Sequence, residues 1–336
     1  MKILADRLSL SKATVSKALR DSYEISEETK RRVLEMAAQL DYTPNPYASS
    51  LRRKKSKTIA VVLPEVADNF FSLAINGIQS IAEVKGYHVL ICLSHEKFEN
   101  EKEILTEFLS GRVDGVLISI SGETNTTEHI AKLQSKNLPV VFFDRRFGNT
   151  DTAAVITNDK ECGYLAARHL LEKGCRNIAF LSVSGCLPIC LERQEGYTSA
   201  LQETGSKPKK PQIFYCNGTE KENYNQVKKL LQGKNRPDGI IASVEKTAIL
   251  VYLVCQELGI HIPRDLKVIA FSTLETAPIL NPPLTTITQP AFDIGKTAAT
   301  LLFRGIEKKN SDISNECIVI PSLLIEREST RNPDAS

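Results

Sequence analysis

The sequence predicts a small all-α module at the N-terminus, followed by an α/β body that contains two doubly wound parallel sheets. Residues 1–43 place apolar side chains at helical spacing. From residue 58 onward, short apolar segments alternate with helical segments, and this series occurs twice at similar length. Such alternation is typical of parallel sheets that are covered by helices on both faces.

The first two helices of the module follow from their apolar spacing. Leu4, Ala5 and Leu8 lie on one face of the first helix. Ser11 can cap the second helix, because its hydroxyl can accept a hydrogen bond from a free N–H of the first turn. The buried face of that second helix comprises Val15, Ala18 and Leu19. Two short helices joined by a tight turn indicate a helix-turn-helix.

A third helix begins at Ser26, and Glu27 and Glu28 suit its positive N-terminal end. Pro44 ends helical continuity after it. The residues that we expect to complete the small core are Val33, Leu34, Ala37 and Leu40.

The second helix has the features of a DNA recognition helix, which presents side chains near its N-terminus to base edges. Residues 1–57 contain 13 Lys and Arg but only 7 Asp and Glu. The whole chain has 43 basic and 40 acidic residues, so the rest of the chain has 30 basic and 33 acidic residues. Localised positive charge favours DNA binding over a solvated basic helical cap. The short or basic residues expected to meet DNA are Ser11, Lys12, Ala13, Thr14, Ser16 and Lys17.

The body contains eight short apolar segments of the buried-strand type. They are 58–63, 89–93, 115–118, 139–143, 154–156, 178–181, 239–242 and 268–271. A helix with apolar spacing follows the first strand, and Gly86 can end it as a left-handed cap. Because ligands bind outside the carboxyl ends of such strands, two facing subdomains place a binding site in the cleft between them.

Several function classes lack their signatures. The sequence has no Walker loop, dinucleotide fingerprint or nucleophilic serine elbow, so we do not expect an enzyme. Cys186 and Cys190 are the only close cysteine pair and have no His or Cys partners nearby, so we expect no metal or other cofactor. No segment is apolar enough to span a membrane or to act as a signal, so we expect a cytoplasmic protein without a membrane partner.

Three motifs of the module resemble the lac-repressor (LacI/GalR) family: LSKATVSKAL at 10–19, ISEETKRRV at 25–33 and LDYTPN at 40–45. The resemblance implies a hinge helix over 46–52 that enters the minor groove of DNA. Leu51 would be its apolar wedge, which unstacks the central base step. The resemblance adds Asn45, Tyr47, Ala48 and Arg52 to the DNA-binding residues. Family members usually have several more residues, including a capping Thr, before their first helix.

The body resembles the periplasmic-binding-protein-like effector domain of the same family. The motifs are YLAARHL at 164–170, RQEGY at 193–197 and PPLTTITQP at 282–290. The resemblance implies three chain crossings between subdomains, near Thr157, Gln289 and Val319, which act as a hinge. The implied effector-binding positions are Asp68, Phe70, Phe71, Asp144, Arg145, Arg193, Val244, Ser272 and Gln289.

Alternative roles remain for several of these side chains. Phe70 and Phe71 could both belong to the core, Asp144 and Arg145 could form a surface ion pair, and Arg193 could pair locally. Val244 and Ser272 stand where the family usually carries polar and acidic groups. Because two arginines remain, the sequence slightly favours an effector that has hydroxyls and negative charge, such as a sugar acid or sugar phosphate, over a neutral sugar.

These features predict a transcriptional regulator whose affinity for operator DNA is controlled by a small effector, a carbohydrate or carbohydrate derivative. The expected form is a homodimer on a roughly palindromic site. The alternative is a solute-binding protein with the same core fold. The expected domains are a helix-turn-helix at 1–43, a hinge at 44–57, a subdomain of 58–156 with 290–318, and another of 157–289 with 319–330.

Overall fold

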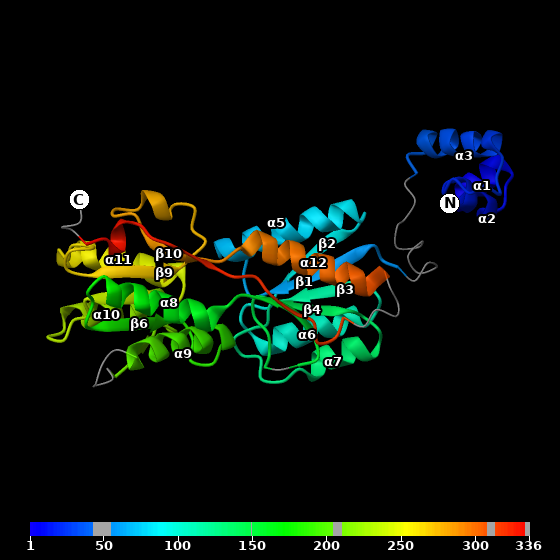
Figure 1. The fold of residues 1–336 in the computed structure, drawn as a ribbon. Helices are drawn as coiled ribbons and strands as arrows, with labels where there is room; N and C mark the ends of the chain where they lie inside the picture. The colour runs from blue at the N-terminus through cyan, green and yellow to red at the C-terminus, as the bar shows by residue number, and fades with distance from the viewer. Residues whose placement is uncertain (43–54, 149, 204–209, 308–312, 333–336) are drawn as a thin grey trace. The chain divides into compact units, whose positions relative to one another are not determined.

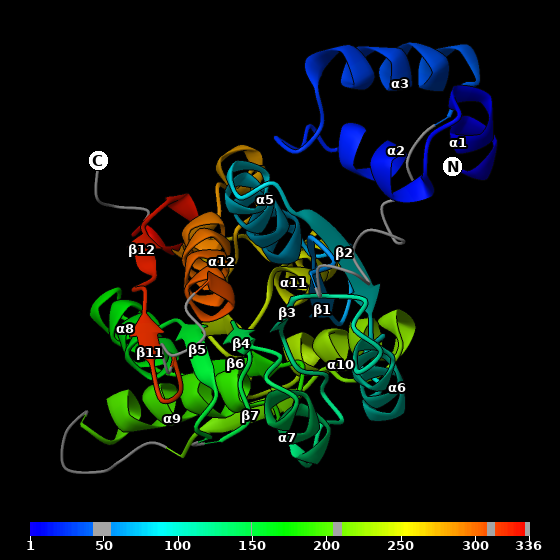
Figure 2. The same cartoon turned by 90° about the vertical axis from the view of Figure 1, so that its right-hand side faces the viewer.

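The computed structural model describes the chain except for residues 43–54, 149, 204–209, 308–312 and 333–336. The chain divides into two compact units, residues 1–56 and 57–336. Figure 1 shows the three helices of the first unit in blue, and Figure 2 shows the same molecule turned by a quarter. The hinge expected at 44–57 lies largely outside the described residues.

The first unit is a three-helix module composed of α1 (Lys2–Leu8), α2 (Lys12–Ala18) and α3 (Glu27–Gln39). The expected Ser11 cap is confirmed, because Ser11 accepts a hydrogen bond from Thr14 N at 3.0 Å. Ser26, where the third helix is expected to begin, caps α3 and accepts a hydrogen bond from Thr29 N at 3.4 Å. The buried apolar side chains of this unit are Leu4, Ala5, Leu8, Val15, Ala18, Val33 and Ala37.

Leu34 does not belong to the small core, so that expectation is wrong. Its side chain is 54% exposed, whereas Val33 is fully buried. Successive residues of an α-helix point about 100° apart, and with Val33 directed at the core Leu34 lies toward the solvent side of α3. Val33 and Ala37, four residues apart, provide the inward face instead.

The first sheet of the larger unit is entirely parallel. Its strands are, in spatial order, β11 (Cys317–Val319), β5 (Ala153–Ile156), β4 (Val140–Phe143), β3 (Gly115–Ile118), β1 (Thr58–Leu63) and β2 (His88–Leu93). Alternate residues of β1 enter two different cores, as strand geometry requires. One face packs against α5 (Asn69–Val84) and α12 (Ala291–Glu307), and the other against α6 (Phe98–Phe108) and α7 (Glu128–Ser135).

The second sheet is parallel except at one edge, where β12 runs antiparallel to β10. Its strands are, in spatial order, β12 (Leu323–Ile325), β10 (Thr285–Thr288), β9 (Lys267–Phe271), β8 (Gly239–Ala242), β6 (Ile178–Ser182) and β7 (Gln212–Tyr215). One face packs against α10 (Glu220–Gln232) and α11 (Glu245–Leu258), and the other against α8 (Asp159–Glu172) and α9 (Pro188–Gln202). Two short 3₁₀ helices, η1 (Ala277–Ile279) and η2 (Glu328–Thr330), complete the fold.

We call the first sheet with its four helices the first subdomain, and the second sheet with its four helices the second subdomain. The chain passes between them three times: from β5 to α8, from β10 to α12, and from β11 to β12 (Figure 1). Three crossings allow the two subdomains to change their relative angle while the crossing segments absorb the motion.

Glycines allow the helices of each subdomain to approach closely. In the second subdomain, a Cβ at Gly163 of α8 would lie 2.1 Å from the backbone oxygen of Arg193 in α9. In the first, a Cβ at Gly77 of α5 would lie 2.1 Å from the backbone oxygen of Phe292 in α12. Any larger residue would therefore separate the paired helices.

Among the described residues, no helix has the length and apolar character to cross a membrane. The same part of the chain contains no group of three or more His, Cys, Asp and Glu side chains arranged to hold a metal ion.

Candidate functional site

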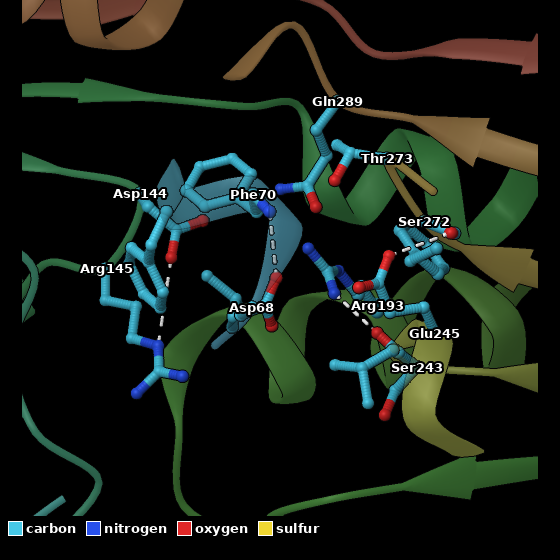
Figure 3. Close-up of a pocket in the computed structure, with 14 residues that line it drawn as sticks. Asp68, Phe70, Asp144, Arg145, Arg193, Ser243, Glu245, Ser272, Thr273 and Gln289 are labelled. Atoms are coloured by element: carbon cyan, nitrogen blue, oxygen red, sulfur yellow. Dashed lines mark hydrogen bonds and ion pairs between the residues drawn. The ribbon is translucent and has the colours of Figure 1, made fainter. Parts of the chain in front are cut away.

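A cavity lies between the two subdomains, where loops follow the carboxyl ends of β1, β4, β8, β9 and β10 (Figure 3). It contains about 410 Å³ free of protein atoms, open solvent included. All nine expected effector-binding residues line it: Asp68, Phe70, Phe71, Asp144, Arg145, Arg193, Val244, Ser272 and Gln289. The structure thus brings together side chains from six separate segments.

Five further lining residues were not expected: Ile189, Ser243, Glu245, Phe271 and Thr273. Ser243 and Thr273 each adjoin an expected position, so the strand-end rule could have indicated them. The apolar run at 268–271 indicates Phe271 only as a buried strand residue. Ile189 lies in the first turn of α9 and carries no polar group by which the sequence could distinguish it.

The wall from the first subdomain combines a helix cap with aromatic rings. Asp68 caps α5 and accepts a hydrogen bond from Phe70 N at 2.9 Å. Phe70 and Phe71 are both buried, with ring centroids 5.4 Å apart in an edge-to-face arrangement, and Phe71 also meets Phe143 of β4. Both phenylalanines therefore belong to the core and also line the cavity.

Asp144 is a buried carboxyl group that follows β4. Asp144 is only 6% exposed. Its backbone has φ 62°, a left-handed conformation that few residues except Gly, Asn and Asp adopt readily. Burial raises the pKa of Asp144 to about 7, although the neighbouring guanidinium of Arg145 opposes the rise. The nearest cationic atom is Arg145 Nε at 3.8 Å, too far for a hydrogen bond.

Arg145 is held mainly by Glu96 rather than by Asp144. Its Nη1 donates to both carboxylate oxygens of Glu96 at 2.9 Å, and Glu96 also accepts a hydrogen bond from Gly122 N at 2.7 Å. The Nε atom of Arg145 is buried and has no hydrogen-bond partner among the described residues. The positive charge beside the cavity is thus largely balanced on its far side.

Arg193 is fixed in the same way in the second subdomain. Its Nε donates to Asp159 Oδ1 at 2.6 Å, and its Nη1 donates to the Ser243 carbonyl oxygen at 2.7 Å. The guanidinium lies 4.1 Å from the centre of the Phe271 ring. Its Nη2 atom is buried without a hydrogen-bond partner in the described part of the chain, and the same holds for Gln289 Nε2.

Glu245 supplies a carboxylate from the second subdomain. It begins α11, and its Oε2 accepts a hydrogen bond from Ser272 Oγ at 3.1 Å (Figure 3). Burial raises the pKa of Glu245 above its ordinary value. The sequence indicated that this wall had lost its acidic group at position 272. The structure shows an acidic side chain there, contributed by a different strand end and hydrogen-bonded to Ser272.

The helical module presents the second candidate surface. Lys12 and Ala13 of α2 are exposed, and Thr14, Ser16 and Lys17 are partly exposed. Lys17 forms an ion pair with Glu24. The Ser11 hydroxyl is used for the helix cap. The other expected DNA-binding residues lie outside the described residues: Asn45, Tyr47, Ala48, Leu51 and Arg52.

Comparisons with known proteins match both parts of the chain. Residues 2–45 match the model of the lacI family of bacterial regulatory proteins, and residues 167–330 match the periplasmic binding protein-like domain. Catabolite control protein A of Priestia megaterium is 29% identical over 329 residues, which cover 98% of each chain. The ribose operon repressor of Halalkalibacterium halodurans is 29% identical over 334 residues, covering 99% of this chain and 97% of the relative.

Solved structures agree in fold. The lac repressor dimer bound to operator and an anti-inducer is 22% identical, with a TM-score of 0.83 over 97% of each chain. A regulator from Enterococcus faecalis V583 with bound ribose is 29% identical, with a TM-score of 0.72 over 81% of this chain and 98% of that one. The helical module, the two-sheet body and these matches identify a lacI-family regulatory module at residues 2–45, joined to a body that contains a periplasmic binding protein-like domain.

Proposed function

We propose that this protein is a DNA-binding transcriptional regulator whose operator affinity is set by a small neutral, hydroxyl-rich molecule in the cleft between the subdomains. The observation that carries the effector class is the pairing of unused donors with buried carboxyl groups. Arg193 Nη2, Gln289 Nε2 and Arg145 Nε have no acceptor among the described residues. Asp144 and Glu245 line the same cavity.

A sugar hydroxyl suits this arrangement because it can donate and accept a hydrogen bond at the same time. Buried polar groups without partners are costly, so a ligand that satisfies them gains affinity. The rings of Phe70, Phe71 and Phe271 offer apolar surface to the C–H face of such a ligand. Among the similar structures, the Enterococcus faecalis regulator with bound ribose supports this class of effector.

The charges of the site argue against the negatively charged effector that the sequence slightly favoured. Three acidic side chains line the cavity, Asp68, Asp144 and Glu245, against two arginines. Each arginine is already paired with a further carboxylate, Glu96 or Asp159. A carboxylate or phosphate on the ligand would therefore meet a surplus of negative charge.

We assign the DNA contacts to the partly exposed N-terminal half of α2 and to the hinge expected at 44–57. The effector domain comprises a subdomain of 58–156 with 290–318 and another of 157–289 with 319–330. The protein acts as a homodimer on a roughly palindromic operator, because one small module offers few base contacts. We place its action in the cytoplasm, where bacterial DNA lies, and assign it no enzymatic activity.

Two measurements on the full-length chain test this function. Selection from a random DNA library should return a roughly palindromic consensus. Calorimetry should detect binding of a neutral sugar, with ribose as the first probe, and weaker binding of matched sugar acids and sugar phosphates. A chain that binds a sugar but selects no DNA sequence would instead be a solute-binding protein. Preferred binding of a sugar phosphate would refute the effector class.

A further inference from the structure

One side chain joins the two subdomains directly beside the cavity. Asn69, the first residue of α5 in the first subdomain, donates through Nδ2 to the Thr273 carbonyl oxygen at 2.5 Å and to Thr273 Oγ1 at 3.2 Å. Thr273 follows β9 in the second subdomain and is 9% exposed. A single amide therefore meets two acceptors of one residue across the cleft.

Both ends of this contact are rigidly supported. On one side, Asp68 caps α5, and the two residues that follow Asn69, Phe70 and Phe71, are buried in the core. On the other side, Ser272 Oγ accepts a hydrogen bond from Leu274 N at 3.0 Å and donates one to Glu245 at 3.1 Å. A contact between two fixed points resists relative motion of the bodies that carry them, rather than only ordering a loop.

Besides the backbone hydrogen bond that Asn69 N donates to the Glu245 carboxylate, two other contacts join the subdomains at this cleft among the described residues, and both are weaker. Lys246 Nζ lies 2.5 Å from Glu65 Oε1, but these side chains are 56% and 41% exposed, and ion pairs of that exposure contribute little. The Cys186 thiol lies 3.5 Å from the Gly122 carbonyl oxygen, and thiols are weak donors. Asn69 is the partly buried member of this set and makes two hydrogen bonds to neutral oxygens.

We propose that Asn69 is a positioning residue of the effector response, which clamps the first subdomain to the second at Thr273 and so sets how readily the cleft opens. The inference goes beyond the proposed function and rests on it only in taking this cleft as the effector site. Closure of a two-body domain by ligand is governed by the free-energy difference between its open and closed states. A hydrogen bond between protein groups across the cleft contributes to this free-energy difference whichever ligand is bound.

Hydrogen exchange of the full-length chain, followed by mass spectrometry, tests the clamp without DNA or effector. In Asn69→Ala, amides at the start of α5 and amides around Thr273 should both exchange about fivefold faster, the factor expected for one net hydrogen bond. Asn69→Asp should show the same faster exchange, because a carboxylate cannot donate a hydrogen bond to the two Thr273 oxygens. This variant should still fold, because Asp is favourable at a helix N-terminus. Asn100→Ala is the control, since Asn100 donates to the Ser94 carbonyl oxygen at 3.1 Å within the first subdomain.

The two sides of the cleft distinguish the outcomes. Faster exchange in both segments in the Asn69 variants, but not around Thr273 in Asn100→Ala, supports the clamp. Faster exchange at the start of α5 alone shows that Asn69 only orders its own helix and overturns the proposal, as does unchanged exchange in both segments. If the clamp is found but no operator is selected, the proposed regulatory function fails and the clamp stands.

Discussion

At Lys17, an ion pair within the protein would compete with the proposed contact to DNA. It is expected to read a base edge, yet it pairs with Glu24, and the two side chains are 43% and 46% exposed. Glu24→Gln should free Lys17 and raise operator affinity by up to about fivefold, since exposed ion pairs contribute about 0.2–1 kcal/mol. Fluorescence anisotropy with the selected operator at two salt concentrations measures the change.

The control for Lys17 is Glu35→Gln in α3, which removes the same charge beside Arg31 instead. If both variants gain operator affinity equally, the effect comes only from net charge, and Lys17 has no specific role. A gain confined to Glu24→Gln, largest for the selected sequence, supports base contact by Lys17.

Asp144 should make the stability of the body depend on pH. Its folded pKa of about 7 lies above the ordinary value of 3.8, so the folded state holds a proton that the unfolded state has lost between these pH values. Stability therefore falls as pH rises through this range, and the penalty levels off above about pH 7. Asp144→Asn should remove a penalty of up to about 4 kcal/mol at pH 8, and less at pH 5.

Urea unfolding of the wild type and of Asp144→Asn at pH 5 and pH 8 measures the difference in unfolding free energy. Asn is a suitable replacement, because it tolerates the left-handed backbone of position 144. An equal stability difference at the two pH values would show that the Asp144 carboxyl is not buried with a raised pKa.

At the scale of the elements, most strands could be predicted from apolar runs, but three of the four edge strands could not. Residues 58–63, 115–118 and 239–242 were predicted with the bounds that the structure has, because both faces of these central strands are buried. Four strands were missed: β7, β10, β11 and β12. Three of them contain exposed residues, and β11 and β12 have three residues each, so neither hydrophobicity nor length distinguishes them from loops.

The strand-end rule predicted much of the candidate site, because in a parallel sheet the ends of distant strands meet at one edge. It could not show how the charges are balanced. Glu96 and Asp159, which hold the two arginines, lie far from them in sequence, and only folding brings them together. The same is true of Glu245, whose carboxylate reaches Ser272.

Helix packing positions Arg193 in addition to its ion pair with Asp159. Gly163→Ala would place a Cβ 2.1 Å from the Arg193 backbone oxygen and so push α9 away from α8. Such overpacking should cost about 1–3 kcal/mol of unfolding free energy and weaken sugar binding as well. Denaturant unfolding and calorimetry measure the two effects.

Gly233→Ala in the same subdomain is the matched control. Its Cβ would lie 3.4 Å from the nearest atom, the Leu230 carbonyl oxygen, and its backbone has φ −68°, which alanine adopts freely. This variant should bind sugar like the wild type. Loss of binding in both variants would show that general destabilisation, rather than displacement of Arg193, weakens the site.

At the scale of the whole molecule, control of DNA binding requires that the cleft and the helical module respond to one shared equilibrium. Linkage then makes the effect reciprocal: if the sugar changes operator affinity by some factor, the operator changes sugar affinity by the same factor. For a coupling of about 1–3 kcal/mol, that factor is about 5–150. Its direction distinguishes a co-repressor, which binds more tightly with operator present, from an inducer, which binds less tightly.

Calorimetry of the sugar with and without saturating operator, and anisotropy of the operator with and without saturating sugar, measure the two factors independently. Equal factors support one conformational equilibrium that involves the whole chain. If operator leaves sugar affinity unchanged while both ligands bind, cleft and module are independent, and the regulatory mechanism is refuted although both sites exist. Asn69→Ala should shift both affinities together if the clamp belongs to that equilibrium, because a change in the free protein's populations acts on every ligand that distinguishes the two states.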